Sequence, residues 1–443
     1  MPAIYGVTSL LRELEDLHQQ NLPAQLVGAS QAFTQLSMLG LLSHLRAGKS
    51  PWQDIVIVLP KAKDIGPWSQ FLAAIHTEDH QTQAALLPYF GCWGNDRFVN
   101  PTLARKQRVH ALSSLLKDDQ VNICVTTIQG LSQKTFVPHE LKEYSIQLHL
   151  EQEKDLDDFE NALHDIGYVN VSSVEEEGSY TIRGGIVDVY PVNADFPVRL
   201  EFWGDNLTSV REFSPADQRS RRALQSVTIA PAAEAVSPEN QRSEQAQRLY
   251  THLLDTDSNA ADRDGMVAAF QKSGRFSGFD MFSPLFRDQS GCGFDYLSER
   301  SLVVFPQTMA SCVEEFSGFH ADILKSFEKD KDAGRPCLHP REHFLDPAES
   351  KARLEKIIKT LEIGNPHASK ADRLLRLESK RVLTGVPAPG VHQGTDRFDK
   401  WVDVIRSTLK QEDGAVCILA RHEEQLERTH NLLLHRDIPC EIR

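Results

Sequence analysis

Two arginines and a tryptophan near the middle of the 443-residue sequence are residue types that often bind other proteins. Arg183 comes first, and Arg199 and Trp203 follow it, with three residues between them. Arginine and tryptophan are enriched at binding hot spots, where truncating one side chain can cost about 2 kcal/mol or more. An outward tryptophan can equally lie beneath a helix of its own domain, and outward arginines are usually solvated. These residue types predict a protein-binding surface if all three side chains point the same way.

The segment that carries Arg199 and Trp203 has the pattern of a half-buried β-strand. Successive side chains of a strand point to opposite faces, so its apolar residues share one face and its polar residues and tryptophan share the other. The core face is Val198, Leu200 and Phe202, and the outer face is Arg199, Glu201 and Trp203. We expect Phe202 in the core and Trp203 at the surface.

A glycine pair interrupts the apolar run before this strand, and a glycine turn follows the strand. The run Tyr180–Tyr190 is rich in β-branched and aromatic residues, and Gly184-Gly185 interrupts it, which places Arg183 on a neighbouring strand. Gly204-Asp205-Asn206 is a turn signal, after which Leu207–Phe213 can return as the second arm of a hairpin. The pattern therefore predicts a small sheet with Arg183, Arg199 and Trp203 on its outer face.

A nucleotide-binding loop is expected to be absent. The strand candidate Ala24–Val27 is followed by Gly28-Ala29-Ser30 and an apolar-periodic helix, Phe33–Leu45, but this turn lacks the Gly-Lys-Ser/Thr that holds phosphates. Gly48-Lys49-Ser50 has the right ending, yet Ser43 stands where the first glycine is needed. The tripeptide also follows a helix and precedes a strand, the reverse of the required order.

The sequence also gives little support for a metal site or for a catalytic nucleophile. Cys337, His339 and His343 lie close together, but a proline interrupts them and no second ligand pair follows. His76 and His80 have helical spacing without the glutamate of a metalloprotease motif. We therefore expect no catalytic residue, no cofactor and no metal in this chain.

Composition places the chain among ordinary globular proteins of about three domains. The formal net charge of −14 and the pI of about 5.7 argue against a dedicated nucleic-acid surface, which is usually basic. The sequence has no apolar run of membrane-spanning length and no visible signal peptide. Its seven cysteines lack paired spacing. These features predict a cytoplasmic protein without a membrane partner.

The first third of the chain predicts a parallel sheet, because strands alternate with helices. The expected helices are Leu10–Gln20, Phe33–Leu45, Trp68–Ile75 and Arg105–Leu116, and the expected strands are Ala24–Val27, Asp54–Pro60, Ala84–Phe90 and Val121–Thr127. From Ser145 the pattern changes to a compact α+β unit with a strand at Ser145–Leu150, a helix at Asp155–Ile166 and a strand at Tyr168–Val174. This unit interrupts the α/β layer.

The remainder predicts a mainly helical extension and then a small C-terminal α/β unit. Expected helical stripes are Ala246–Leu254, Ala260–Phe270, Val313–Phe327 and Ala352–Ile363, and Leu302–Gln307 is an expected buried strand. Val386–Thr395 is a Pro/Gly linker. The last unit is expected to contain a helix at Phe398–Leu409, a strand at Ala415–Leu419 and a helix at Glu423–His435.

Several motifs in the α+β unit resemble one known module. These are Ile182–Pro191, Val198–Asp205, Ser209–Phe213 and Gln218–Ser220. Together they are similar to the domain 2 signature of the UvrB-like module, which occurs in the repair protein UvrB and in transcription-repair coupling factors (Mfd). The resemblance favours the N-terminal region of a coupling factor, where the module's nucleotide site is degenerate.

This resemblance implies an α/β fold with four parts. They are a degenerate P-loop-type α/β domain (1–133), an inserted UvrA-binding α+β domain 2 (134–218), a helix-rich domain 1b (219–385) and a small domain 3-like α/β unit (386–443). The implied function is non-catalytic recruitment of UvrA to stalled transcription complexes for nucleotide excision repair. By position, Arg183, Arg199 and Trp203 match the UvrA-contacting residues of the family. In a complete coupling factor, RNA polymerase and DNA are implied partners through regions absent here.

The alternative is an enzyme, a UvrB-type DNA-dependent ATPase that verifies damage. The family's ATP-active members carry an acidic pair at the end of the strand that corresponds to Leu302–Gln307, where this chain has Phe305-Pro306-Gln307. Such an enzyme also needs a tyrosine-rich hairpin, for which Gly91–Pro101 leaves no room. Both features favour the binding module.

Overall fold

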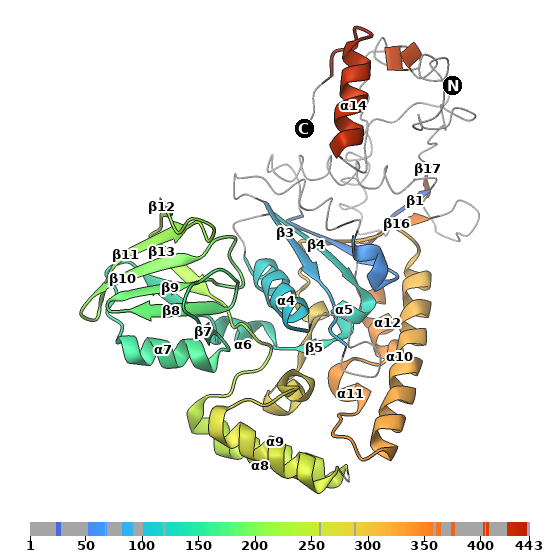
Figure 1. The fold of residues 1–443 in the computed structure, drawn as a ribbon. Helices are drawn as coiled ribbons and strands as arrows, with labels where there is room; N and C mark the ends of the chain where they lie inside the picture. The colour runs from blue at the N-terminus through green and yellow to red at the C-terminus, as the bar shows by residue number, and fades with distance from the viewer. Residues whose placement is uncertain are drawn as a thin grey trace.

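Two β-sheets organise the chain (Figure 1). The computed structural model describes residues 52–66, 68, 82–91, 101–117, 121–256, 258–287, 289–357 and 360–364, with the shorter stretches 24–27, 374–376, 402–403, 405–406 and 423–440. The expected elements Leu10–Gln20, Phe33–Leu45 and Ala415–Leu419 lie outside these residues, as do the turn at Gly28 and most of Trp68–Ile75 and Phe398–Leu409.

The larger sheet has seven strands, all parallel, in the order β17-β1-β16-β15-β2-β4-β3. The strands are β1 (Ala24–Val27), β2 (Asp54–Leu59), β3 (Thr82–Leu87), β4 (Val121–Thr127), β15 (Ser301–Phe305), β16 (Thr360–Gly364) and β17 (Leu374–Arg376). Every residue of β2 and β15 is buried, as expected for central parallel strands whose two faces are both covered. The mixed α/β class with a parallel sheet is thus confirmed.

Strand β16 differs from expectation. The apolar stripe at Ala352–Ile363 predicted a helix, but α12 (Pro347–Glu355) ends early and β16 begins at Thr360. Strand β16 fills the place between β1 and β15 and pairs with both in parallel register. A short apolar run fits helix and strand periodicities equally well, and here the available sheet position favours the strand.

The smaller sheet belongs to a segment inserted between β4 and β15. Its order is β12-β11-β10-β9-β8-β7, antiparallel except for the β7–β8 pair. The strands are β7 (Val169–Asn170), β8 (Ser179–Arg183), β9 (Ile186–Val189), β10 (Val198–Trp203), β11 (Asn206–Phe213) and β12 (Ser220–Ala223), and helix α7 (Leu156–Asp165) lies beside them. Only Val169–Asn170 of the expected strand Tyr168–Val174 forms a strand.

A separate strand pair closes the inserted segment. β6 (Ile146–His149) leads into the segment and β13 (Ser226–Ile229) leads out of it, and the two pair antiparallel. β12 and β13 therefore extend the strand pairing beyond residue 218. The proposed domain boundaries at 133, 218 and 385 remain predictions.

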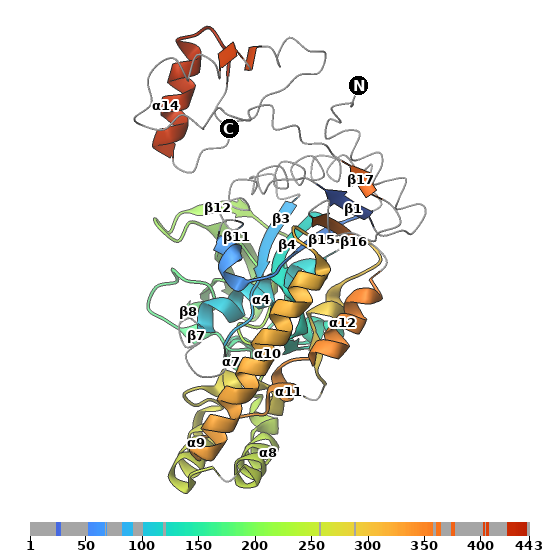
Figure 2. The ribbon, with the colours of Figure 1, turned by 90° about the vertical axis from the view of Figure 1, so that its right-hand side faces the viewer.

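Helices predominate between the inserted segment and the last strands of the large sheet. They are α8 (Arg242–Asp255), α9 (Ala260–Ser273), α10 (Met309–Asp332), α11 (Pro340–His343) and α12, with 3₁₀ helices η3 (Glu239–Gln241), η4 (Phe279–Phe286) and η5 (Gly293–Tyr296). Stacked rings of Phe270, Phe279 and Phe286 form the core under α8 and α9. Figure 2 shows α10 crossing in front of the large sheet.

The remaining described elements are short or lie apart from the sheets, except for α4. They are α4 (Pro101–Leu115), α5 (Ile128–Ser132), α6 (Pro138–Glu143), η1 (Ala62–Asp64), the pair β5 (Lys134–Thr135) and β14 (Gly291–Cys292), and α14 (Glu423–Leu434), which agrees with the expected last helix. Among the described helices, none has the length and apolar character needed to cross a membrane.

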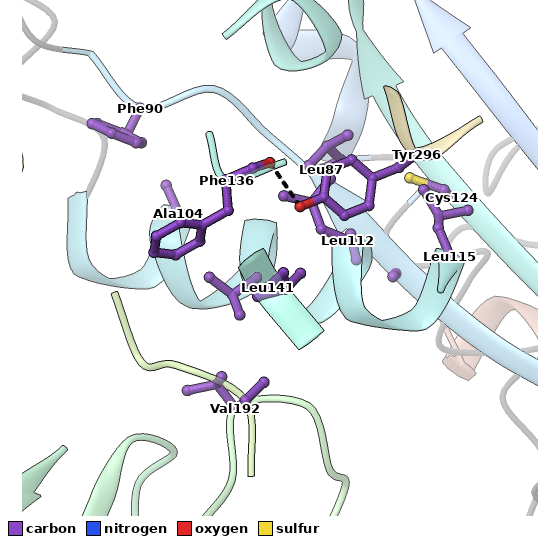
Figure 3. Packing of buried hydrophobic residues seen from close by; sticks show 14 of the residues in the cluster. Leu87, Phe90, Ala104, Leu112, Leu115, Cys124, Phe136, Leu141, Val192 and Tyr296 are labelled. Carbon is purple, nitrogen blue, oxygen red and sulfur yellow. Dashed lines mark hydrogen bonds between the residues drawn. The ribbon is translucent and has the colours of Figure 1, made fainter. Parts of the chain in front are cut away.

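One continuous core joins the two sheets, with α4 between them (Figures 1 and 3). The hydroxyl of Tyr296 donates a hydrogen bond to the carbonyl of Phe136 at 2.9 Å within this core. The fully buried Arg108 of α4 pairs with Glu234, which follows β13, and donates to the carbonyl of Gly130 at 2.9 Å. These contacts fix the return of the inserted segment against the large sheet.

Candidate functional site

The candidate site is the face of the small sheet opposite α7. Strand β10 alternates as predicted, with Val198, Leu200 and Phe202 buried and Trp203 84% exposed. Phe202 packs toward Phe159 of α7, with ring centroids 6.2 Å apart. The indole is therefore displayed to solvent by a strand whose other face is fixed in the core.

Two glycine turns, Gly184-Gly185 and Gly204-Asp205, lie at this end of the sheet. Arg183 pairs with Ile186 across the two-residue turn Gly184-Gly185, and Gly184 has a left-handed φ of 61° that favours glycine. A Cβ at Gly185 would lie 2.6 Å from the carbonyl oxygen of Phe202, so the hairpin lies close to β10. This close approach holds the start of β9 beside the end of β10, where Trp203 projects.

Arg199 is held by its own domain. Its guanidinium donates two hydrogen bonds to the carboxylate of Asp188 on β9, at 2.7 and 2.8 Å, and lies over the ring of Phe213 at 4.9 Å. The bond to Asp188 raises the pKa of Arg199 above its usual value, although partial burial opposes this. The arginine is half-buried, so its first role is to neutralise a buried carboxylate.

Arg183 is more exposed than Arg199. It ends β8, and its Nη2 donates to the carbonyl oxygen of Ser172 in the loop between β7 and β8. The remaining donors of a guanidinium form a fork suited to carboxylate groups. Arg183 can therefore present positive charge at the edge of the face.

The strand registers place the three predicted residues on one face. Arg183, Ile186 and Glu201 form one row across β8, β9 and β10, and Asp188 and Arg199 lie in the next row. Trp203 is two residues beyond Glu201 on the same side of β10, despite a register shift between Glu201 and Phe202. The structure thus brings an exposed indole and two arginines together, one of them already paired.

Ile186 belongs to this face and was missed in the sequence. It is 41% exposed, an unusual position for a large aliphatic side chain in a strand that is otherwise buried. Its register opposite Glu201 makes it a diagonal neighbour of Trp203, within reach of a large ring. The same period-two alternation, applied to β9 from Asp188, would have identified it.

The other candidate groups have structural roles. His339 caps α11, because its Nδ1 accepts a hydrogen bond from the Arg341 amide at 3.1 Å. His343 is buried, and burial lowers its pKa to about 3. Within the described part of the chain, no cluster of three or more His, Cys, Asp or Glu side chains could hold a metal ion.

The carboxyl edge of the large sheet is where ligands usually bind in such folds. Strand β15 runs parallel to β16 and β2, so the residues that follow it lie at this edge. A cavity of about 800 Å³ opens nearby between the end of β2 and α10, where Lys61 is paired with Glu315 at 2.6 Å. The residues after β15 are Pro306 and Gln307, which cannot supply carboxylates to a magnesium ion.

Comparison with known proteins classifies the inserted segment. Residues 146–234 match the family model of the UvrB interaction domain. This range begins at β6 and includes the small sheet, α7 and the closing strand β13. The candidate face therefore lies entirely within a domain of this class.

Over a longer stretch, the chain is similar to transcription-repair-coupling factors. The protein from Haemophilus influenzae is 26% identical over 302 residues, covering 68% of this chain and 25% of the relative. The one from Myxococcus xanthus is 27% identical, covering 65% and 24%, and the one from Escherichia coli K12 is 25% identical, covering 71% and 26%. The chain spans about a quarter of the length of these relatives.

Proposed function

We propose that this chain is the UvrA-recruiting, non-catalytic module of a transcription-repair coupling factor and acts in nucleotide excision repair at stalled transcription complexes. The observation that carries the proposal is Trp203, whose indole is 84% exposed on the outer face of a UvrB interaction domain. Similarity to coupling factors over about two-thirds of the chain supports it. RNA polymerase and DNA would bind regions of the complete factor that this chain does not cover.

The chemistry of the face suits an acidic partner surface with an apolar pocket. Trp203 can fill the pocket and supply most of the binding energy, since buried aromatic residues dominate hot spots. Arg183 can pair with a carboxylate at the rim, where charge mainly accelerates encounter and sets the salt dependence. Arg199 would join UvrA only while keeping its pair with Asp188, so we assign it a positioning role that contributes charge secondarily.

A binding measurement with purified UvrA tests this proposal. The parent chain immobilised on a sensor should bind UvrA, and Trp203→Ala should weaken that binding strongly while the fold is retained. Val169→Ala is a matched control, because Val169 is a 60% exposed apolar residue on the edge strand β7, outside the row that contains Trp203. Equal UvrA binding by the parent and Trp203→Ala would refute the site.

The proposed lack of catalysis rests on two sequence positions. The turn after β1 has no Gly-Lys-Ser/Thr, and the turn after β15 has Pro306-Gln307 in place of an acidic pair. An ATP site needs both a phosphate loop and carboxylates for the metal. The large sheet is then a degenerate P-loop-type scaffold. Measurable DNA-stimulated ATP hydrolysis by this chain would instead favour a UvrB-type damage-verification enzyme.

A further inference from the structure

A second pocket lies at the junction of the two sheets and the helical region. It has a volume of about 610 Å³ and is lined by α4, the loop between β7 and β8, the segment after β13 and the segment before η4. It is distinct from the Trp203 face. The volume falls in the range of small-molecule sites.

An arginine with one unpartnered buried nitrogen lines this pocket. Among the described residues, the buried Nη2 of Arg275 has no hydrogen-bond partner. Its guanidinium lies over the ring of Phe279 at 5.1 Å. Burial lowers the pKa of Arg275, and the negative charge of Asp165 raises it in part. A buried charged donor without an acceptor raises the free energy of the folded protein, and an anion bound to the guanidinium would offset that penalty.

Gly167 makes room for this guanidinium. A Cβ at that position would lie 2.6 Å from Arg275 Nη2, and the glycine has a φ of +97°, which side-chain-bearing residues rarely adopt. The backbone of the turn between α7 and β7 therefore lies close against the Arg275 guanidinium. The arginine is fitted into the pocket wall and is not a solvated surface residue.

The other charged groups of the pocket are largely balanced. Arg105 pairs with Asp280, and Lys106 donates to the backbone carbonyl of Glu177. Burial raises the pKa of Glu177, and the nearby positive charge of Lys106 offsets part of that rise. Glu175 and Glu176 are exposed at the mouth. Arg275 is therefore a cation of the lining with an unpartnered donor, and the exposed glutamates disfavour ligands with several negative charges.

Apolar surface surrounds the cation. Ala232, Ala233 and Phe276 line the pocket together with the Phe279 ring that supports Arg275. A ligand that satisfies both features has one carboxylate and an apolar body. We propose that this junction pocket binds a small monocarboxylate, with its carboxylate on Arg275 and its apolar body against Phe276 and the two alanines.

Calorimetric titration of the full 443-residue chain with N-acetylphenylalanine tests the proposal. Saturable binding is expected at millimolar concentration, and the uncharged probe N-acetylphenylalanine amide should bind at least about tenfold more weakly, because charge-assisted bonds to arginine are lost. No saturable binding of the acid, or equal binding of the amide, would overturn the proposal. Inorganic phosphate binding as tightly as the acid would overturn the assignment of an apolar-bodied ligand.

Two variants locate the site. Arg275→Met should abolish binding of N-acetylphenylalanine without lowering the thermal midpoint, since it removes a buried donor that lacks a partner. Arg275→Lys should retain weaker binding, because a lysine keeps the charge and loses the two-pronged geometry. Arg248→Met on α8 is the control and should bind like the parent. Unchanged binding by a folded Arg275→Met protein would place the ligand elsewhere and refute the assignment.

Discussion

The two faces of strand β10 differ in what fixes their side chains. On one face, Leu200 and Phe202 are enclosed by a continuous core that includes Phe159 of α7. On the other face, Trp203 is 84% exposed, Ile186 of the neighbouring strand β9 is 41% exposed, and Arg199 is paired with Asp188. One face therefore sets the stability of the inserted domain, and the other is available for a partner.

This difference separates two kinds of mutational effect. Substitutions on the core face should change the free energy of unfolding and reduce binding only through loss of folded protein. Substitutions at the exposed positions should reduce binding and leave the fold intact. Arg199 lies between the two classes, since it faces outward but satisfies a carboxylate that is almost completely buried.

The largest effect is expected on the core face. Phe202→Ala should lower the free energy of unfolding by about 3–5 kcal/mol, the usual cost of deleting a buried phenylalanine side chain. Urea denaturation followed by circular dichroism measures this. Trp203→Ala, one residue away, should change the same quantity by no more than about 0.5 kcal/mol. Similar losses for both variants would contradict the separation of the faces.

The next largest effect is the loss of UvrA affinity in Trp203→Ala. We expect a drop of about thirtyfold, which corresponds to about 2 kcal/mol for truncating an aromatic hot spot. Surface plasmon resonance should show the change mainly in the dissociation rate. Trp203→Phe should retain most of the affinity because it keeps an aromatic ring. An affinity unchanged by both substitutions would show that the indole stays outside the interface.

Arg199→Ala should show a mixed effect. It leaves the Asp188 carboxylate without its arginine, so we expect a loss of about 1–3 kcal/mol in the free energy of unfolding. Adding Asp188→Asn should recover part of this loss, because the unpaired charge is removed. Strict additivity in this double-mutant cycle would mean that the two side chains are not coupled. If the stabilised double variant also regains UvrA affinity, Arg199 acts only by positioning.

The smallest effect concerns Ile186. Ile186→Ala should weaken UvrA binding by about fivefold, or about 1 kcal/mol, as expected for a side chain beside a hot spot that helps to exclude water. Val169→Ala removes a similar exposed side chain on β7 and should leave the affinity unchanged. Equal effects of the two substitutions would show that Ile186 has no particular place in the interface.

Local patterns predicted much of this architecture. The alternation of Val198–Trp203, the glycine turn after it, the Gly184-Gly185 turn and the buried runs that became β2, β4 and β15 all appear at or near the expected positions. Each depends on side-chain period or turn chemistry, which act over a few residues. The helix α7, with Asp155 as its N-cap and Gly167 after its end, was predictable for the same reason.

Longer-range features could not be predicted in this way. The apolar pattern of β16 predicts part of a helix. The segment forms a strand because it pairs with both β1 and β15 in the large sheet, and a local pattern does not show this pairing. The partner of Arg199 could not be identified either, since Asp188 reaches it only through the register of β9 on β10. Pairings between distant segments depend on how the whole chain folds.

The amino-acid sequence alone fixed the side on which Trp203 projects and the residues missing from a nucleotide site, because alternation and motif chemistry are local properties. The tertiary structure determined how much of each side chain is exposed to a partner. It buried the Asp188 carboxylate under Arg199, left Ile186 beside the indole and placed Arg275 in a pocket lined by four segments. Burial and charge pairing arise from contacts between segments far apart in the chain, so they are properties of the packed molecule.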